Sequence, residues 1–236
     1  MGFISESILG AAGKKAAATA IKFGKTPEQK KVIDYFLSEG GCLSKVMKDA
    51  EYDQLVNEVL QSINWEEKVL SKLGIDKSQI SEIEPIVTEG YYSYSSDLNE
   101  DDKLLKAFKV FYKTGKDDKF RSSAYQKTYM YFSSDQVYLY QMTFHMDKGD
   151  TEEVAKEFFY KDITSFTTIS KTTENISKKT SGCLKKKDSA VKSLTTRTEF
   201  KLIVPGDEFS CSLNGSELRE DSLQGLKAKL REKKNA

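Results

Sequence analysis

The spacing of apolar side chains changes once along the chain, at Pro85, and this change limits the possible folds more than any other feature. Before Pro85 apolar residues recur every three or four positions, as in residues 32–37. After it they recur every second position, as in residues 136–146. The first spacing is typical of a helix with one buried face and the second of a strand. The sequence therefore predicts a helical region over residues 1–84 and a β domain over residues 85–236.

Helix termini in the first part are marked by residues with clear physical roles. Thr26 and Gln29 can exchange hydrogen bonds in a capping box, with Pro27 at the first helical position. Gly74 is placed to end a later helical stretch, because glycine adopts the left-handed conformation at a helix C-terminus. Pro85 then closes the helical region, since the residue before a proline avoids helical angles.

The second part contains several predicted hairpins. Residues 125–132 and 136–146 form two runs rich in aromatic and β-branched residues, joined by Ser133-Ser134-Asp135. Residues 200–204 and 208–213 form the last predicted hairpin, turned at Pro205-Gly206-Asp207. A closing helix is predicted from Ser216, with one leucine-lined side: Leu218, Leu223, Leu226 and Leu230.

About seven strands in meander order followed by an amphipathic helix resemble a pleckstrin-homology (PH)-like domain. Residues 116–123, 136–141, 159–163 and 204–207 resemble segments of an uncharacterised bacterial family with a PH-like C-terminal half. This resemblance covers roughly residues 65–236. It implies an α+β fold in which a PH-like bent antiparallel β-barrel is capped by the C-terminal helix. It brings no known activity with it.

Composition excludes several classes of protein. Lys+Arg 37 against Asp+Glu 36 leaves a formal net charge of +1, so no global charge favours nucleic acid, and we expect no nucleic-acid partner. No apolar run reaches the length of about 18 residues that a spanning helix needs. The three cysteines lie far apart, as in reduced cytoplasmic proteins. We therefore expect a cytoplasmic protein, with peripheral attachment to the inner face of the membrane as the alternative.

The first 25 residues are rich in alanine and glycine and leave three interpretations open. They can form an ordinary helix that packs through its small side chains, a surface for a partner or for self-association, or a shallow membrane-surface anchor. Lys15 and Lys22 fall close to Ile4 and Ile8 on a helical wheel, which blurs the amphipathic pattern. The ordinary helix is the preferred interpretation.

No catalytic or metal-binding constellation is visible in the sequence. His145 is the only imidazole, and residue spacing supplies neither a nucleophile with an orienting group nor a set of zinc ligands. We therefore expect no enzyme activity, no metal and no cofactor. A carboxylate-based enzyme is the competing interpretation, because Asp/Glu pairs can act without a sequence motif. It would require a deep pocket lined by convergent acids.

Two basic groups are candidate binding sites. Lys113, Lys116, Lys119 and Arg121 resemble the first-hairpin pattern of lipid-binding PH domains, in which several donors converge on inositol phosphates. Asp117 and Asp118 within this group weaken its potential, and exposed turn lysines are the plain alternative. The second group is a basic interaction region: Lys178, Lys179, Lys185, Lys186 and Lys187.

The second basic group lies in a stretch without periodicity, residues 170–197, which we predict to be a mobile or functional excursion from the β domain. The helical region, by contrast, is acidic, with Glu51, Asp53 and Glu58 among its carboxylates. The basic and acidic regions can attract each other between chains or between the two halves of one chain. The other interpretation is that both are simply solvent-exposed charged faces.

Together these features predict a non-catalytic interaction or scaffold module that binds protein partners through its helical region and the barrel edge. The alternative is peripheral binding to an anionic membrane through the first-hairpin lysines and the N-terminal segment.

Overall fold

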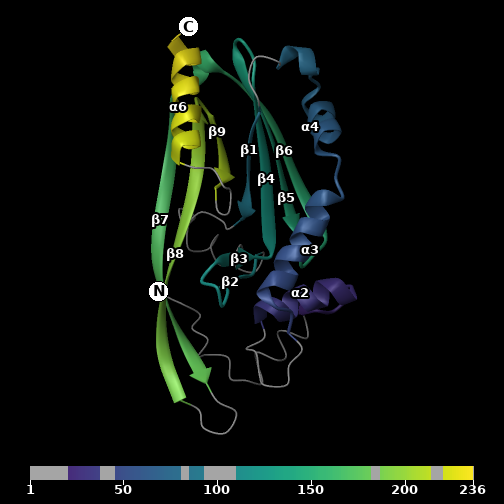
Figure 1. Ribbon diagram of the computed structural model, residues 1–236. Coiled ribbons are helices and arrows are strands. Elements are labelled where there is room, and N and C mark those ends of the chain that lie inside the picture. The colour runs from purple at the N-terminus through teal and green to yellow at the C-terminus, as the bar shows by residue number, and fades with distance from the viewer. Residues whose placement is uncertain are drawn as a thin grey trace.

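Helices and antiparallel sheets form separate layers in the structure, a computed structural model that describes residues 21–37, 46–80, 85–92, 110–181, 187–213 and 220–235. The helices on one side are α2 (Pro27–Leu37), α3 (Asp49–Gln61) and α4 (Trp65–Leu73), followed by the short 3-10 turn η1 (Lys77–Gln79). The C-terminal helix α6 (Glu220–Asn235) lies at the other side, beside the second sheet (Figure 1). The α+β class is therefore confirmed.

The strands form two larger sheets and one small hairpin. The first sheet has the order β1-β4-β5-β6, with β1 (Ile86–Tyr91), β4 (Ala124–Phe132), β5 (Gln136–His145) and β6 (Asp150–Phe159). The hairpin of β2 (Tyr112–Thr114) and β3 (Phe120–Ser122) is inserted between β1 and β4. The 3-10 turn η2 (Tyr160–Asp162) leads to the second sheet, β7 (Ser165–Ser181), β8 (Lys187–Val204) and β9 (Asp207–Ser212).

Two of the predicted helix termini are confirmed, at Thr26 and at Gly74, whereas residues 81–84 before Pro85 lie outside the described residues. The Thr26 amide donates to Gln29 Oε1 at 2.9 Å, and the Gln29 amide donates to Thr26 Oγ1 at 3.2 Å, which completes the capping box. Gly74 ends α4 with a positive φ of 64°. The helical pattern before Gly74 is divided between α3 and α4, because Ser62 ends α3 by donating its amide to Glu58 O and Val59 O. None of the described helices has the length and apolar character needed to cross a bilayer.

One hydrophobic core lies between the helices and the first sheet, and we call it the helix–sheet core. Trp65 of α4 stacks on Tyr129 and meets Phe144 edge-on, with ring centroids 5.8 Å apart in both pairs. Its buried members come from α2, α3 and α4, the segment after α4, and strands β4 and β5: Val32, Tyr35, Tyr52, Val56, Leu60, Val69, Leu73, Ile75, Ile80, Tyr131, Tyr138, Tyr140, Met142 and Phe144. The boundary predicted at residue 84 thus divides the chain but not this core.

The opposite face of the first sheet packs against the second sheet in a sheet–sheet core. Val137 and Leu139 of β5 point into it, whereas Tyr138 and Tyr140 point into the helix–sheet core, so the predicted alternation along β5 is confirmed. Leu230 of α6 is 1% exposed in the sheet–sheet core. Of the other leucines predicted for this helix, Leu218 lies outside the described residues, as do the side chains of Leu223 and Leu226.

The two larger sheets do not close into the predicted barrel within the described strands; they remain separately hydrogen-bonded. Buried glutamine side chains bridge them where a continuous ladder would otherwise run. The Ser212 amide donates to Gln126 Oε1 at 2.8 Å, and Gln141 Nε2 donates to Ser210 O at 2.9 Å. Because side chains satisfy these backbone groups, β9 can lie against the first sheet without a backbone ladder to it.

Residues 170–181 and 187–197 leave the β domain as a regular two-stranded ribbon, because β7 and β8 pair continuously over them. That this excursion is mobile or functional stays a prediction. The pairing runs from Ser165↔Ile203 to Ser181↔Lys187, whereas β9 pairs with β8 only over Glu199–Val204. We call the two-stranded extension, residues 170–181 and 187–198, the β arm; it runs beyond all other strands (Figure 1). It shows no alternation in sequence because a ribbon that leaves the core has no need of an apolar face.

Threonine and serine support the β arm in place of apolar side chains. The hydroxyls of Ser170 and Thr198 lie 3.1 Å apart, and those of Thr172 and Thr196 lie 2.9 Å apart across the two strands. Such cross-strand hydroxyl pairs stabilise strand pairing, and threonine favours extended backbone.

A single substitution tests whether the two cores unfold together. Leu139→Ala removes a fully buried side chain from the sheet–sheet core, so the free energy of unfolding should fall by about 2–5 kcal/mol. Because β5 also supports the helix–sheet core, urea unfolding followed by Trp65 fluorescence should shift as much as unfolding followed by far-UV circular dichroism. A fluorescence transition that stays at the wild-type midpoint would show that the helices unfold independently of the sheets.

Candidate functional site

The β2–β3 hairpin connects the sheets to the helices, and its pairing register divides the predicted anion-binding residues. Lys113 lies directly opposite Arg121 in the hairpin, so these two side chains share one face. Both are directed to the helical layer, where Lys113 bonds to α2 and Arg121 bonds to α3. Lys116 and Lys119 lie in or beside the turn and are exposed.

Arg121 is buried and uses all of its N–H donors within the protein. Its side chain is 3% exposed. Nε and Nη2 donate to the two carboxylate oxygens of Asp53, both at 2.7 Å. Nη1 and Nη2 donate to Asp117 at 2.7 and 2.8 Å, and Nη1 also reaches Lys119 O at 3.4 Å. The planar guanidinium thus joins α3 to the hairpin through two bidentate contacts.

The carboxylates around Arg121 are held in their charged form. Hydrogen bonding to Arg121 lowers the pKa of Asp117 far below its usual range. Burial by itself would raise the pKa of Asp53, but the hydrogen bonds from Arg121 and Tyr91 lower it overall. Tyr91 donates to Asp53 Oδ1 at 2.5 Å, and burial together with this bond raises the pKa of Tyr91. The cluster is therefore one guanidinium between two carboxylates, supported by a neutral phenol.

Lys113 is held between aromatic rings and a carboxylate. Its Nζ donates to Tyr35 O at 2.7 Å, lies 3.1 Å from the centre of the Tyr35 ring and is 4.0 Å from Asp49 Oδ1. Burial lowers the pKa of Lys113 to about 8, with Arg121 acting in the same direction and Asp49 against it. The side chain therefore loses its charge more easily than an ordinary lysine.

Further hydrogen bonds fix the hairpin to α2 and α3. Tyr52 of α3 donates to Ser122 O at 2.7 Å, and the Lys116 amide donates to Asp49 Oδ2 at 2.8 Å. Tyr35 donates to Asp49 Oδ1 at 2.8 Å and stacks on Tyr52 with ring centres 4.7 Å apart. Since these contacts cross between elements, hairpin and helices form one connected unit.

A cavity of about 370 Å³ lies beside this unit. It brings together residues of α3, β1, β4, β8 and the hairpin: Asp53, Val56, Asn57, Tyr91, Lys119, Phe120, Arg121, Tyr125 and Thr196. Of the four predicted anion-binding residues, Lys119 and Arg121 line the cavity, while Lys113 faces Tyr35 and Lys116 is exposed at the turn. Because the Arg121 donors are occupied within the protein, Lys116 and Lys119 are the two of these four residues that remain exposed to solvent.

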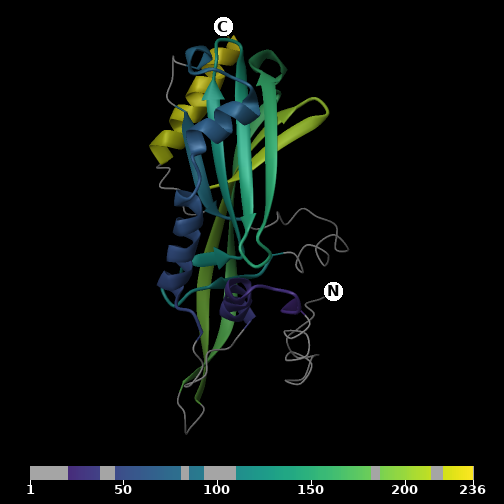
Figure 2. The ribbon, with the colours of Figure 1, turned by 90° about the vertical axis from the view of Figure 1, so that its right-hand side faces the viewer.

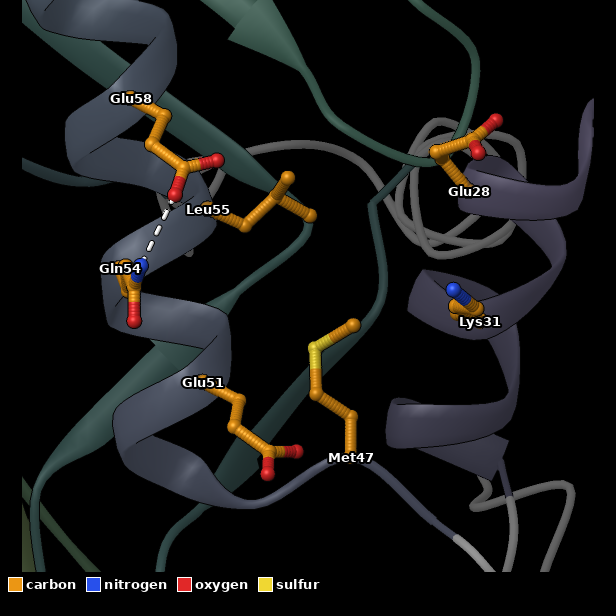
Figure 3. A pocket seen from close by; sticks show the side chains of 7 residues that line it. All are labelled: Glu28, Lys31, Met47, Glu51, Gln54, Leu55 and Glu58. Carbon is orange, nitrogen blue, oxygen red and sulfur yellow. Dashed lines mark hydrogen bonds between the residues drawn. The ribbon is translucent and has the colours of Figure 1, made fainter.

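A second hollow, of about 210 Å³, lies between α2 and α3, and we call it the helix groove (Figure 3). Met47 and Leu55 reach into the space between the helices, whereas Glu28, Glu51 and Glu58 stand around it (Figure 3). Gln54, which donates to Glu58 Oε1 at 2.9 Å, and Lys31 complete the lining. Within the described ranges no ion pair involves any of the three glutamates. The groove thus has an apolar floor and a mostly acidic rim.

Three residues of the second predicted basic group, Lys178, Lys179 and Lys187, belong to the β arm. The backbones of Lys178 and Lys179 lie in β7 and that of Lys187 begins β8, while their side chains are outside the description. Lys185 and Lys186 lie outside the described residues. The structure therefore places the backbones of Lys178, Lys179 and Lys187 at the far end of the arm from the sheets.

Among the described residues, the histidine and the one cysteine are both buried. His145 is 3% exposed at the end of β5, with Nε2 3.4 Å from Glu152 Oε1. Cys211 is buried, and burial raises the pKa of its thiol to about 12, which keeps it protonated. Among the described residues, no three or more His, Cys, Asp or Glu side chains are arranged to hold a metal ion.

Sequence reasoning did not identify the partners of the basic residues. Asp53 was placed among solvated or complementary acids, but it accepts two hydrogen bonds from Arg121 and one from Tyr91. The available signal was Asp117 inside the basic pattern, because a carboxylate four residues before an arginine can pair with it when the hairpin turns. No sequence pattern predicted the helix groove, because its two walls come from separate helices and their relative placement is not visible in the sequence.

Comparisons with models of protein families, with curated proteins and with solved structures find no match for this chain. What the protein can do is therefore inferred from its own residues and geometry.

Replacing Arg121 should weaken the connection between helices and sheets. Arg121→Met leaves Asp53 and Asp117 without their cation, although both are partly solvated, so the free energy of unfolding should fall by about 2–3 kcal/mol. Urea denaturation measures this loss. Lys119→Met is the matched control and should change stability by no more than about 0.5 kcal/mol, because Lys119 is exposed. Equal effects of the two substitutions would contradict the proposed role of Arg121.

Lys113 should titrate well below the usual lysine range. In the folded protein the proton leaves near pH 8, whereas the ordinary value is 10.5, so the unfolded state binds more protons between these values. The free energy of unfolding should therefore rise with pH across this window in the wild type, relative to Lys113→Met. Urea denaturation at pH values from about 7.5 to 9.5, together with ¹³Cε NMR of Lys113, measures both effects. Parallel pH curves for the two proteins would exclude this assignment.

Proposed function

We propose that this protein is a non-catalytic interaction module in the cytoplasm, built on a PH-like fold, and that it binds protein partners through the β arm. The order of elements supports the PH-like assignment. Four strands that pair in chain order, once the β2–β3 hairpin is set aside, are followed by three more and then by a helix that buries Leu230 between the sheets. The hairpin and the β arm are the additions to that plan.

The observation that carries the proposal is the length of the β arm. Its strands pair from Ser170↔Thr198 to Ser181↔Lys187, which corresponds to about 40 Å of ribbon at about 3.3 Å per residue. An isolated two-stranded hairpin is only marginally stable in water. A ribbon that extends so far from the core is therefore well suited to gain stability from a bound surface.

The composition of the β arm indicates the chemistry of that surface. Residues 170–198 contain eight Lys or Arg residues and two Asp or Glu residues, although the whole chain has a net charge of only +1. Positive charge concentrated on an arm favours partners with acidic surfaces and increases their rate of association. We therefore assign acidic protein surfaces as the partners of the arm.

Peripheral membrane binding is the second candidate, and one observation favours it. Tyr112 on the β2–β3 hairpin is 58% exposed, and the same hairpin carries the exposed residues Lys116 and Lys119 in or beside its turn. An aromatic ring next to lysines is a combination that suits an anionic membrane surface. Against it, Lys113 and Arg121 are committed to contacts with the helices.

Removal of the β arm tests the proposed function. Ser170 and Thr198 are opposite each other in the register, so an Asn-Gly turn between them should close a short hairpin and leave both cores intact. The shortened protein should keep the wild-type far-UV spectrum but lose the proteins that the immobilised full chain retains from a lysate of its source organism. Quantitative mass spectrometry of the two eluates measures the loss.

Vesicle sedimentation at low salt separates the two candidates. Because the basic arm is itself attracted to anionic vesicles, the protein without the arm is the one compared. Protein binding through the arm predicts equal sedimentation of this shortened protein with neutral and with anionic vesicles. Retention of the same proteins with and without the arm would contradict the proposed function. Sedimentation with anionic vesicles alone would favour the membrane candidate.

A further inference from the structure

The β arm and the helix groove are complementary features of the same chain. The groove has an apolar floor of Met47 and Leu55 and three glutamates at its rim. The arm is basic, and it also contains isolated aliphatic residues, such as Ile176 and Val191, at neighbouring positions of the register. A segment that combines cations with a few aliphatic residues is what a groove of this kind is suited to bind.

We propose that the β arm of one copy docks in the helix groove of a second copy, so that the protein forms a dimer by reciprocal exchange of arms. This inference rests on the proposed function, because it names the acidic protein surface to which the arm binds. The groove supplies the carboxylates of Glu28, Glu51 and Glu58, and the arm supplies Lys178 and Lys179.

The rim of the groove is available for such a contact. Glu28, Glu51 and Glu58 are exposed, and their hydrogen bonds leave carboxylate oxygens for a further donor: Glu51 Oε2 accepts from the Lys48 amide, and Glu58 Oε1 accepts from Gln54. Lys31 is the one cation among the lining residues. The local field therefore attracts an incoming ammonium group.

The arrangement of the elements favours a closed pair. The free end of the β arm and helix α2 lie toward the same end of the molecule, away from α6, in both views (Figures 1 and 2). Two copies that approach by these ends, related by a two-fold axis, can each offer an arm to the other's groove. A two-fold axis makes the two contacts identical and closes the assembly. Since the net charge is only +1, long-range repulsion between the copies is small.

Sedimentation equilibrium of the full chain tests the proposal. The average mass should approach that of a dimer at about 50 mM salt and fall toward the monomer at about 500 mM, where the screening length is only about 4 Å. A salt-dependent association between opposite charges has this direction, whereas association through apolar surface alone does not weaken with salt.

Charge reversal identifies the two surfaces. A groove variant, Glu28→Lys with Glu58→Lys, and an arm variant, Lys178→Glu with Lys179→Glu, should each raise the dimer dissociation constant at least about tenfold. A mixture of the two variants should recover association, because each reversed arm then meets a reversed groove in the other protein. This recovery also shows that neither variant is misfolded.

A matched control separates local from global charge. Glu157→Lys with Glu208→Lys changes the net charge by the same amount as the groove variant but places the lysines on β6 and β9, outside the groove. This variant should associate as the wild type does.

Three results would overturn the proposal: a monomeric wild type at low salt, equal weakening by the control and groove variants, or no recovery in the mixture. If the wild type is monomeric but the arm still retains other proteins from the lysate, the proposed function stands and only the identity of the partner is wrong. If removal of the arm changes neither the association of the protein with itself nor the set of proteins retained from the lysate, the proposed function itself fails.

Discussion

Burial of β5 on both faces is the constraint on which the rest of the structure depends. Its odd-numbered positions, such as Val137 and Leu139, face the second sheet, and the even-numbered Tyr138 and Tyr140 face the helices. A strand with one solvated face would support a single layer, but β5 supports a layer on each side. The helices before Pro85 and the sheet after Phe159 are therefore held together through β5, with its neighbour β4 contributing Met130 and Phe132 to one core and Tyr131 to the other.

The Arg121 cluster is the polar counterpart of this apolar arrangement. It ties the small β2–β3 hairpin to α3 through Asp53, while Asp117 closes the hairpin turn around the same guanidinium. A buried cation of this kind adds little net stability compared with a well-packed apolar group, but it fixes orientation, because only one placement of the helix satisfies all of its donors. Lys113 and Arg121, which would otherwise suit an anion, are thereby used to position α2 and α3, and the helix groove lies between these two helices.

The proposed interactions use the surfaces that neither the two cores nor the Arg121 cluster occupies. The sheets bury their apolar faces in two cores. The β arm extends beyond these cores and needs no apolar face, and it is polar with a strong excess of lysine. The helices bury one face against the sheet and keep an acidic outer face, where the helix groove opens. Segregated charge on a nearly neutral chain is a means of specific association rather than of general attraction to polyanions. The geometry therefore favours binding between proteins.

The sequence alone determined the α+β class, the capped start of α2, the end of α4 at Gly74 and the alternation along β5, because each depends on side chains within a few residues of one another. It did not determine that the sheets remain unclosed, since Gln126 and Gln141 bridge to strands far along the chain. It indicated an excursion at residues 170–197 but not that its two strands pair, because a ribbon without a buried face has no periodic pattern. Tertiary structure alone decided that Arg121 binds Asp53, 68 residues away, and not a ligand. The physical reason is that periodicity records which side of an element is buried, whereas pairing partners depend on how the elements are placed in space.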